Sequence, residues 1–168
     1  MSDPRHLRCY QYVNVEYERV RQAVRRDAAG IFQRATATAA SRAQELASTL
    51  RVSVGALEIG ADIRIVVREV SDKQSPLGEP RTEIELSWSA TSAAALFPSM
   101  EATLSLYPLS AHETQLDLDG RYRPPLGAVG QALDALVGHR IAEASVLRFL
   151  QEVASRINAE LGATIGAS

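Results

Sequence analysis

The C-terminal third of the chain constrains the fold most. Between Gly120 and Gly162 the sequence reads as the end of a strand, a Pro-Pro pair and then the longest helical pattern in the protein. Apolar residues recur there at steps of three and four, the period of a helix with one buried stripe. They are Val129, Leu133, Leu136, Val137, Ile141, Ala144, Val146, Phe149, Leu150, Val153, Ile157 and Leu161. Such a helix must bury its apolar stripe against an apolar surface that the rest of the chain forms.

The length of this helical pattern predicts a break in it. A continuous helix from Gly127 to Leu161 would be roughly 50 Å long, at about 1.5 Å per residue. A globule of 168 residues is only about 40 Å across. We therefore expect a bend or break near Gly138, with the main helix from about His139 onward.

The remaining segments predict one strand, then helices, then a run of strands. Alternating or β-rich stretches predict strands at 8–15, two within 50–70, and one each at 82–92, 100–109 and 113–123. Helical spacing or alanine-rich composition predicts short helices at 17–26, 27–32 and 36–49, with Asp27 as a cap.

Three of the predicted strands alternate between apolar and polar residues, which indicates an antiparallel sheet with one dry and one wet face. Strands that are separate from helices along the chain indicate the α+β class, here an antiparallel sheet of about six strands whose dry face the long helix covers. A chain of 168 residues, 46% of them apolar, predicts a single domain spanning residues 1–168. We expect residues 1–7 and 162–168 to be flexible.

Composition argues against several classes of function. A formal charge of -2 gives no long-range attraction to phosphate backbones, so we expect no nucleic-acid partner.

Cys9 is the single cysteine, which excludes an internal disulfide and a thiolate metal cluster. Its position in a predicted strand favours a role as a small buried side chain. We expect no cofactor and no metal. No apolar run approaches the roughly 18 residues that span a bilayer, and no signal peptide is visible, so a cytoplasmic location is the default expectation.

The order of elements and the C-terminal residues resemble a known family. The residues are Gly120, Tyr122, Pro124, Pro125, Leu126, Gly127, Leu133, Asp134, Arg140, Ala142, Glu143, Ala144, Phe149 and Leu150. Together they are similar to the end of the last strand and the start of the long helix in the START-like superfamily, often written SRPBCC, which includes Bet v 1-like proteins and polyketide cyclases. The resemblance implies the helix-grip fold, with a curved sheet and a cavity between sheet and helix that binds a lipid, sterol, polyketide or other apolar molecule.

The candidate site follows from the alternation of the strands. No glycine-flanked serine is present, and of the histidines His6, His112 and His139 only His139 lies where a cavity is expected. The candidate cavity residues are Trp88, Tyr122, Ile65, Leu86, Leu104, Leu118, Phe97, His139 and Phe149. Trp88 and Tyr122 each combine an apolar body with one hydrogen-bonding group, so they are expected to orient the ligand. The apolar connection Ser92 to Met100 is expected to lie over the cavity mouth as a gate.

Three functions remain open at this point. The first is a binding or carrier protein for a hydrophobic small molecule, without enzymatic activity. The second is a cyclase or aromatase in which Tyr122 or His139 acts as acid or base, and a polar pair converging inside the cavity would favour it. The third is a ligand-free interaction module that uses the arginine-rich segment Tyr17 to Arg26 as its contact surface. The sequence predicts neither the ligand nor the oligomeric state.

Overall fold

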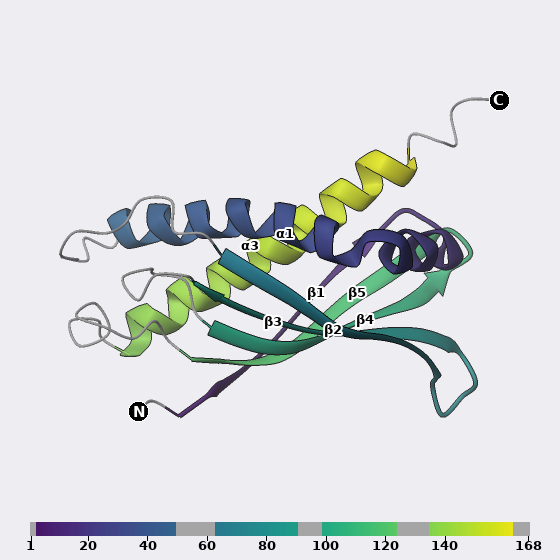
Figure 1. Cartoon of the computed structure of the whole chain (residues 1–168), viewed down its shortest axis with the longest axis horizontal. Coiled ribbons are helices and arrows are strands. Elements are labelled where there is room, and N and C mark those ends of the chain that lie inside the picture. Colours follow the sequence, from purple (N-terminus) through teal and green to yellow (C-terminus); the bar gives the residue numbers. More distant parts are fainter. Residues whose placement is uncertain (1–2, 50–62, 91–98, 124–134, 163–168) are drawn as a thin grey trace.

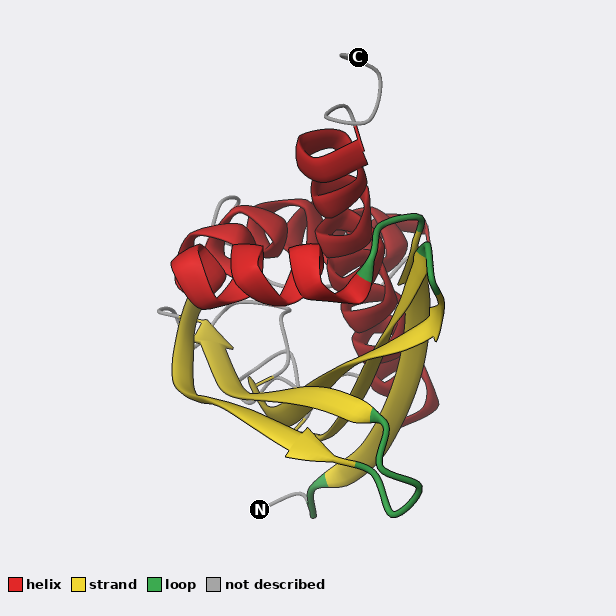
Figure 2. Cartoon of the chain, turned by 90° about the vertical axis from the view of Figure 1, so that its right-hand side faces the viewer, coloured by secondary structure: helices red, strands yellow, loops and turns green. Residues whose placement is uncertain are grey.

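The fold is an antiparallel sheet with two helices on one of its faces (Figures 1 and 2). The computed structural model describes residues 3–49, 63–90, 99–123 and 135–162. Its elements are β1 (Arg5–Val13), α1 (Tyr17–Thr49), β2 (Ile63–Gln74), β3 (Pro80–Ala90), β4 (Ser99–Ser110), β5 (Glu113–Arg123) and α3 (Ala135–Gly162). This is the α+β class and the helix-grip order that the sequence predicts.

The sheet has the strand order β1-β5-β4-β3-β2, and every neighbouring pair is antiparallel. β1 and β2 are therefore opposite edges, and α1 connects them along one face. One inward row of the sheet runs through Cys9, Leu118, Leu104, Ile84 and Val70, which are partners in the register. The apolar members of each strand thus meet on the face that the helices cover, as their alternation predicts.

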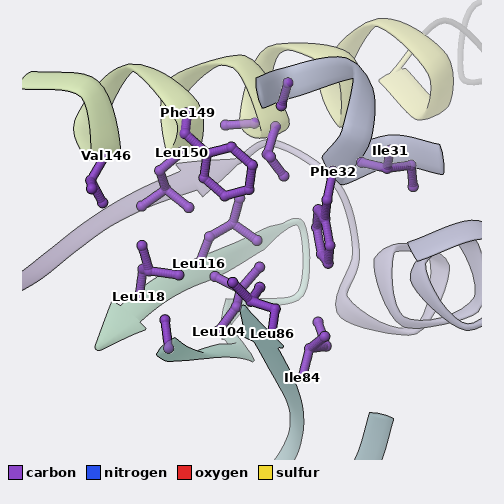
Figure 3. Close-up of a cluster of buried hydrophobic side chains, with 14 of the residues drawn as sticks. Ile31, Phe32, Ile84, Leu86, Leu104, Leu116, Leu118, Val146, Phe149 and Leu150 are labelled. Atoms are coloured by element: carbon purple, nitrogen blue, oxygen red, sulfur yellow. The ribbon is translucent and has the colours of Figure 1, made fainter. Parts of the chain in front are cut away.

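The core lies between this face and the two helices (Figure 3). Phe149 and Leu150 of α3 and Phe32 of α1 are fully buried above the strands. The Phe149 ring lies 4.8 Å from that of Trp88 and 6.2 Å from that of Phe32, measured between centroids. The middle of the core is therefore closely packed, with apolar area removed from water as its main source of stability.

The first helical region corrects one prediction. Within α1 two helical segments meet at a kink at Asp27 (φ -152°, ψ 51°), so the expected division there is present, whereas the expected division between 27–32 and 36–49 is not. Asp27 does act as the predicted cap, because its Oδ1 accepts a hydrogen bond from the Gly30 N–H at 3.0 Å. The helix continues past Phe32 because no glycine or proline follows and because Ile31, Phe32 and Ala35 keep one buried stripe.

The strand count and the N-terminus also differ from expectation. The described part of the sheet has five strands and not six, since the first of the two runs predicted within 50–70 falls outside the described residues. Residues 5–7 were expected to be flexible, but they belong to β1, and Leu7 is buried. β1 pairs with β5 over its whole length, from Val13 to Arg5, and this pairing orders the start of the chain. Residues 163–168 fall outside the described residues.

The expected break near Gly138 is not present. α3 begins at Ala135 and remains helical through Gly138 to Gly162. Its 28 residues span about 42 Å, close to the expected diameter of the globule, so a helix of this length needs no break. No helix in the described ranges is long and apolar enough to cross a membrane.

Candidate functional site

The candidate site lies at the end of the sheet where α3 begins. The register pairs Ile63 with Ala90 and Ser99 with Arg123, so the first residues of β2 and β4 meet the last residues of β3 and β5 there. The start of α3 lies at the same end, on the left of Figure 1. Residues that are far apart in the sequence are thereby gathered at one place.

A chain of polar groups begins at Tyr122, the inward-facing residue near the end of β5. Its side chain is fully buried, and its hydroxyl is hydrogen bonded to Nδ1 of His139. The other ring nitrogen of His139, Nε2, lies 3.0 Å from Oε1 of Glu143, four residues later on α3. The His139 side chain is 30% exposed and that of Glu143 is 53% exposed. The three groups therefore lead from the buried phenol toward solvent.

The surroundings of the Tyr122 phenol on balance favour its neutral form. Burial raises the pKa of Tyr122, the Glu143 carboxylate raises it further, and the nearby Arg5 guanidinium opposes both. Tyr122 is therefore a neutral phenol near pH 7 and can donate its proton to Nδ1 of His139. The imidazole then carries its own proton on Nε2, where Glu143 accepts it.

An apolar wall adjoins this polar chain. Ile65, Trp88, Met100 and Tyr122 are successive partners across β2, β3, β4 and β5, so they form one inward row. Ile65 is 8% exposed, and Trp88 and Met100 are each 2% exposed. This row is therefore a continuous apolar part of the core that ends at one hydroxyl.

The predicted cavity residues fall into three groups. Seven of them are buried between the sheet and the helices, namely Ile65, Leu86, Trp88, Leu104, Leu118, Tyr122 and Phe149. Of these, Leu104 and Leu118 belong to the packed middle of the core, about 13 Å from Tyr122 along the strands (Figure 3). His139 is half-buried and bonded to Tyr122. Phe97 lies outside the described residues.

The predicted gate can be followed only at its end. Of Ser92 to Met100, the stretch before Ser99 falls outside the described residues. Ser99 and Met100 are the first two residues of β4. That end of the segment is therefore strand, and Met100 belongs to the apolar wall.

Sequence reasoning missed two residues of the site, Glu143 and Arg5. Glu143 follows His139 by four residues, a spacing that places both side chains on one face of a helix, so its role could have been found. Arg5 gave no such signal, because its position beside Tyr122 depends on the pairing of β1 with β5.

The other two histidines and the cysteine lie away from the Tyr122–His139 pair. His6 Nε2 is 2.8 Å from Asp119 Oδ1, and His112 is exposed at the β4–β5 turn. Burial, together with the Asp117 charge, raises the pKa of the Cys9 thiol to about 12, so it is a poor nucleophile near neutral pH. Within the described residues, no group of three or more His, Cys, Asp or Glu side chains is arranged to hold a metal ion.

Comparison with known proteins finds similarity at the level of structure. No family model matches the chain, and no curated protein matches it. The Zhui aromatase/cyclase from a Streptomyces species is 15% identical, with 94% of this chain and 96% of that chain covered and a TM-score of 0.46. Norcoclaurine synthase from Thalictrum flavum is 10% identical, with 92% and 87% covered and a TM-score of 0.41. The lipid transfer and protein localization domain of human StarD13 is 9% identical, with 88% and 76% covered and a TM-score of 0.39.

Proposed function

We propose that this protein binds a hydrophobic small molecule, such as a lipid or a polyketide, between the sheet and α3. The observation that carries the proposal is the row Ile65, Trp88, Met100 and Tyr122, an apolar wall that ends at a buried phenol bonded to His139. The proposal includes a single domain of residues 1–168 in the cytoplasm, without a nucleic-acid partner.

The packing of the core limits where the ligand lies. Phe149 contacts the rings of both Trp88 and Phe32, so the middle of the sheet is filled by the protein's own side chains. The ligand therefore lies at the end of the sheet, against Trp88 and Tyr122. Apolar area held there contributes roughly 25 cal/mol per Å² removed from water, and the phenol fixes the orientation of one polar group of the ligand.

Trp88 provides a direct test, because it is the single tryptophan of the chain. We expect the hydrophobic dye 1-anilinonaphthalene-8-sulfonate to quench Trp88 fluorescence by energy transfer, and oleic acid to displace the dye.

The Tyr122→Phe variant should still bind both molecules, with an affinity lowered by a few-fold, since the substitution removes one hydroxyl from an apolar site. Tyr10→Phe is the matched control, because Tyr10 is 64% exposed. Failure of the dye and of oleic acid to change Trp88 fluorescence would contradict the proposal.

A second candidate function is an enzyme of the cyclase or aromatase kind. The Tyr122, His139 and Glu143 chain favours it, because these groups are arranged for proton transfer. Tyr122 would donate its phenolic proton to a ligand carbonyl oxygen. The ring of His139 would first take up a proton from solvent at Nδ1, which carries none in the resting hydrogen bond, and would then pass that proton to the phenolate while Glu143 orients the ring. The Tyr122→Phe variant separates the two functions, because it abolishes turnover of a poly-β-ketone substrate in an enzyme and only changes affinity in a carrier.

The interaction-module alternative has less support, because several arginines of its expected contact surface, Tyr17 to Arg26, form internal contacts. Arg21 and Arg25 donate to the Asp72 carboxylate at 2.7 and 2.6 Å, and Arg19 donates to the Leu161 carbonyl at 2.7 Å. These arginines hold α1 against β2 and α3. They stabilise the fold, and we do not assign the helix a partner.

A further inference from the structure

The outer face of the sheet, which the helices leave uncovered, carries a hollow of about 450 Å³. It lies at the same end as the candidate site but on the opposite side of the sheet. Arg64 and Arg68 of β2 line one side, and Arg121 and Arg123 of β5 line the other. Ser87, Ser89, Ser99 and Glu101 of β3 and β4 lie between them.

The register explains why the hollow has this form. Arg64 pairs with Ser89, and Arg123 pairs with Ser99, so the two short hydroxyl side chains of β3 and β4 lie between the long cationic ones of β2 and β5. β2 and β5 are three strand spacings apart, about 14 Å. Two groups of guanidinium ions therefore face each other across a floor of serine hydroxyls.

The residues that the structure describes do not balance the charge of the hollow. Arg68 Nη2 lies 3.1 Å from Glu101 Oε1. Arg64, Arg121 and Arg123 are exposed and form no ion pair with any residue in the described ranges. Four arginines against one glutamate leave a local surplus of three positive charges in a chain whose formal charge is -2.

Elsewhere on the outer face of the described strands the cationic residues pair with acidic ones, whereas Glu69 and Glu85 form no ion pair. Arg8 forms two hydrogen bonds with Asp117, at 3.0 and 2.6 Å. Lys73 and Arg81 both pair with Glu83. The unpaired arginines are thus concentrated at the hollow, where an anionic ligand would meet them.

We propose that this hollow binds a small molecule carrying two or more phosphate groups. Guanidinium ions bind phosphate oxygens through paired hydrogen bonds, and serine hydroxyls donate to the oxygens that remain. A volume of about 450 Å³ falls within the roughly 300–1,000 Å³ of small-molecule sites. Opposing arginine walls suit a ligand whose anionic groups are several ångströms apart, such as a free polyphosphorylated metabolite or a phosphorylated lipid headgroup.

Calorimetric titration with inorganic tripolyphosphate in 150 mM salt tests the proposal. We expect micromolar affinity, and we expect Arg64→Gln and Arg123→Gln each to weaken it about tenfold, the loss of one charge-assisted contact. Because these side chains have no partner in the described part of the chain, both variants should keep the wild-type melting temperature. Arg148→Gln is the matched control, since Arg148 is an exposed arginine on α3, and it should bind like the wild type.

Vesicle sedimentation distinguishes the two sources of phosphate. Binding to phosphatidylcholine vesicles that contain phosphatidylinositol bisphosphate, lost in Arg64→Gln and Arg123→Gln, indicates a lipid headgroup. Binding of tripolyphosphate without binding of vesicles indicates a free metabolite. The proposal is overturned if neither probe binds, if Arg148→Gln weakens binding as much as the other two variants, or if neither Arg64→Gln nor Arg123→Gln weakens it.

Discussion

At the scale of single residues, Gly120 shows how tightly the sheet is packed beside the candidate site. It lies on the inward face of β5, between Leu7 of β1 and Ala102 of β4. A Cβ added to Gly120 would meet Ala102 Cβ at 2.7 Å and the Glu101 carbonyl oxygen at 2.8 Å, and it would also contact the end of Met100. The absence of a side chain at Gly120 therefore allows Met100 to lie in the wall next to Tyr122.

We predict that Gly120→Ala destabilises the protein by about 1–3 kcal/mol, because the added methyl group overpacks a rigid part of the core. The Gly162→Ala variant is the control, since nothing lies within 4 Å of a Cβ added there. Urea unfolding followed by circular dichroism measures both. Equal stability of the two variants would show that the backbone at Gly120 shifts freely, contrary to the described packing.

At the scale of elements, Asp72 joins α1 to the sheet. Its carboxylate on β2 accepts hydrogen bonds from Arg21 and Arg25 of α1 and from Thr82 of β3, the last at 2.9 Å. The Thr82 hydroxyl is in turn 2.7 Å from the hydroxyl of Tyr17 at the start of α1. The Arg21 hydrogen bond, aided by those from Thr82 and Arg25, holds the pKa of Asp72 well below its usual range.

We predict that Asp72→Asn lowers the free energy of unfolding at pH 7 by about 1–2 kcal/mol, since the carboxylate is partly exposed and its ion pairs are screened. A depressed carboxyl pKa adds stability above the unfolded value, near 4, and that stability is lost as the pH falls toward the folded value. The variant should therefore lose less stability than the wild type between about pH 5 and pH 2.

Glu113→Gln is the control for this experiment, because the contact of its carboxylate with Ser110 Oγ is 3.5 Å long. Urea unfolding repeated across this pH range gives both curves. If Asp72→Asn and the wild type show the same acid dependence, Asp72 does not hold α1 in the way described.

The sequence predicts those helices and strands whose residues show a clear local pattern of apolar and polar positions. The alternation of β5 gave its range, Glu113–Arg123, and the apolar stripe of α3 gave the face that is buried. The start of β1 was missed because Arg5–Leu7 is ordered by pairing with residues more than a hundred positions later. Tyr122 and His139 could each be proposed as a site residue from its own position in the sequence. The hydrogen bond between them could not be predicted, because it depends on where α3 begins relative to the sheet.

At the scale of the whole molecule, the two faces of the sheet have different chemistry at the same end. The inward face presents Ile65, Trp88 and Met100 beside the Tyr122 phenol. The outward face presents four arginines around serine hydroxyls. A single sheet separates the two surfaces, and Trp88 and Met100 of the apolar wall also border the outer hollow.

Native mass spectrometry of the freshly purified protein, followed by denaturing extraction, tests the central claim most directly. We predict a complex heavier than the chain by a defined mass, and release of an apolar molecule of that mass on denaturation. A mass equal to that of the chain alone, unchanged after incubation with a panel of lipids and aromatic polyketides, would contradict the claim that this fold holds a hydrophobic ligand.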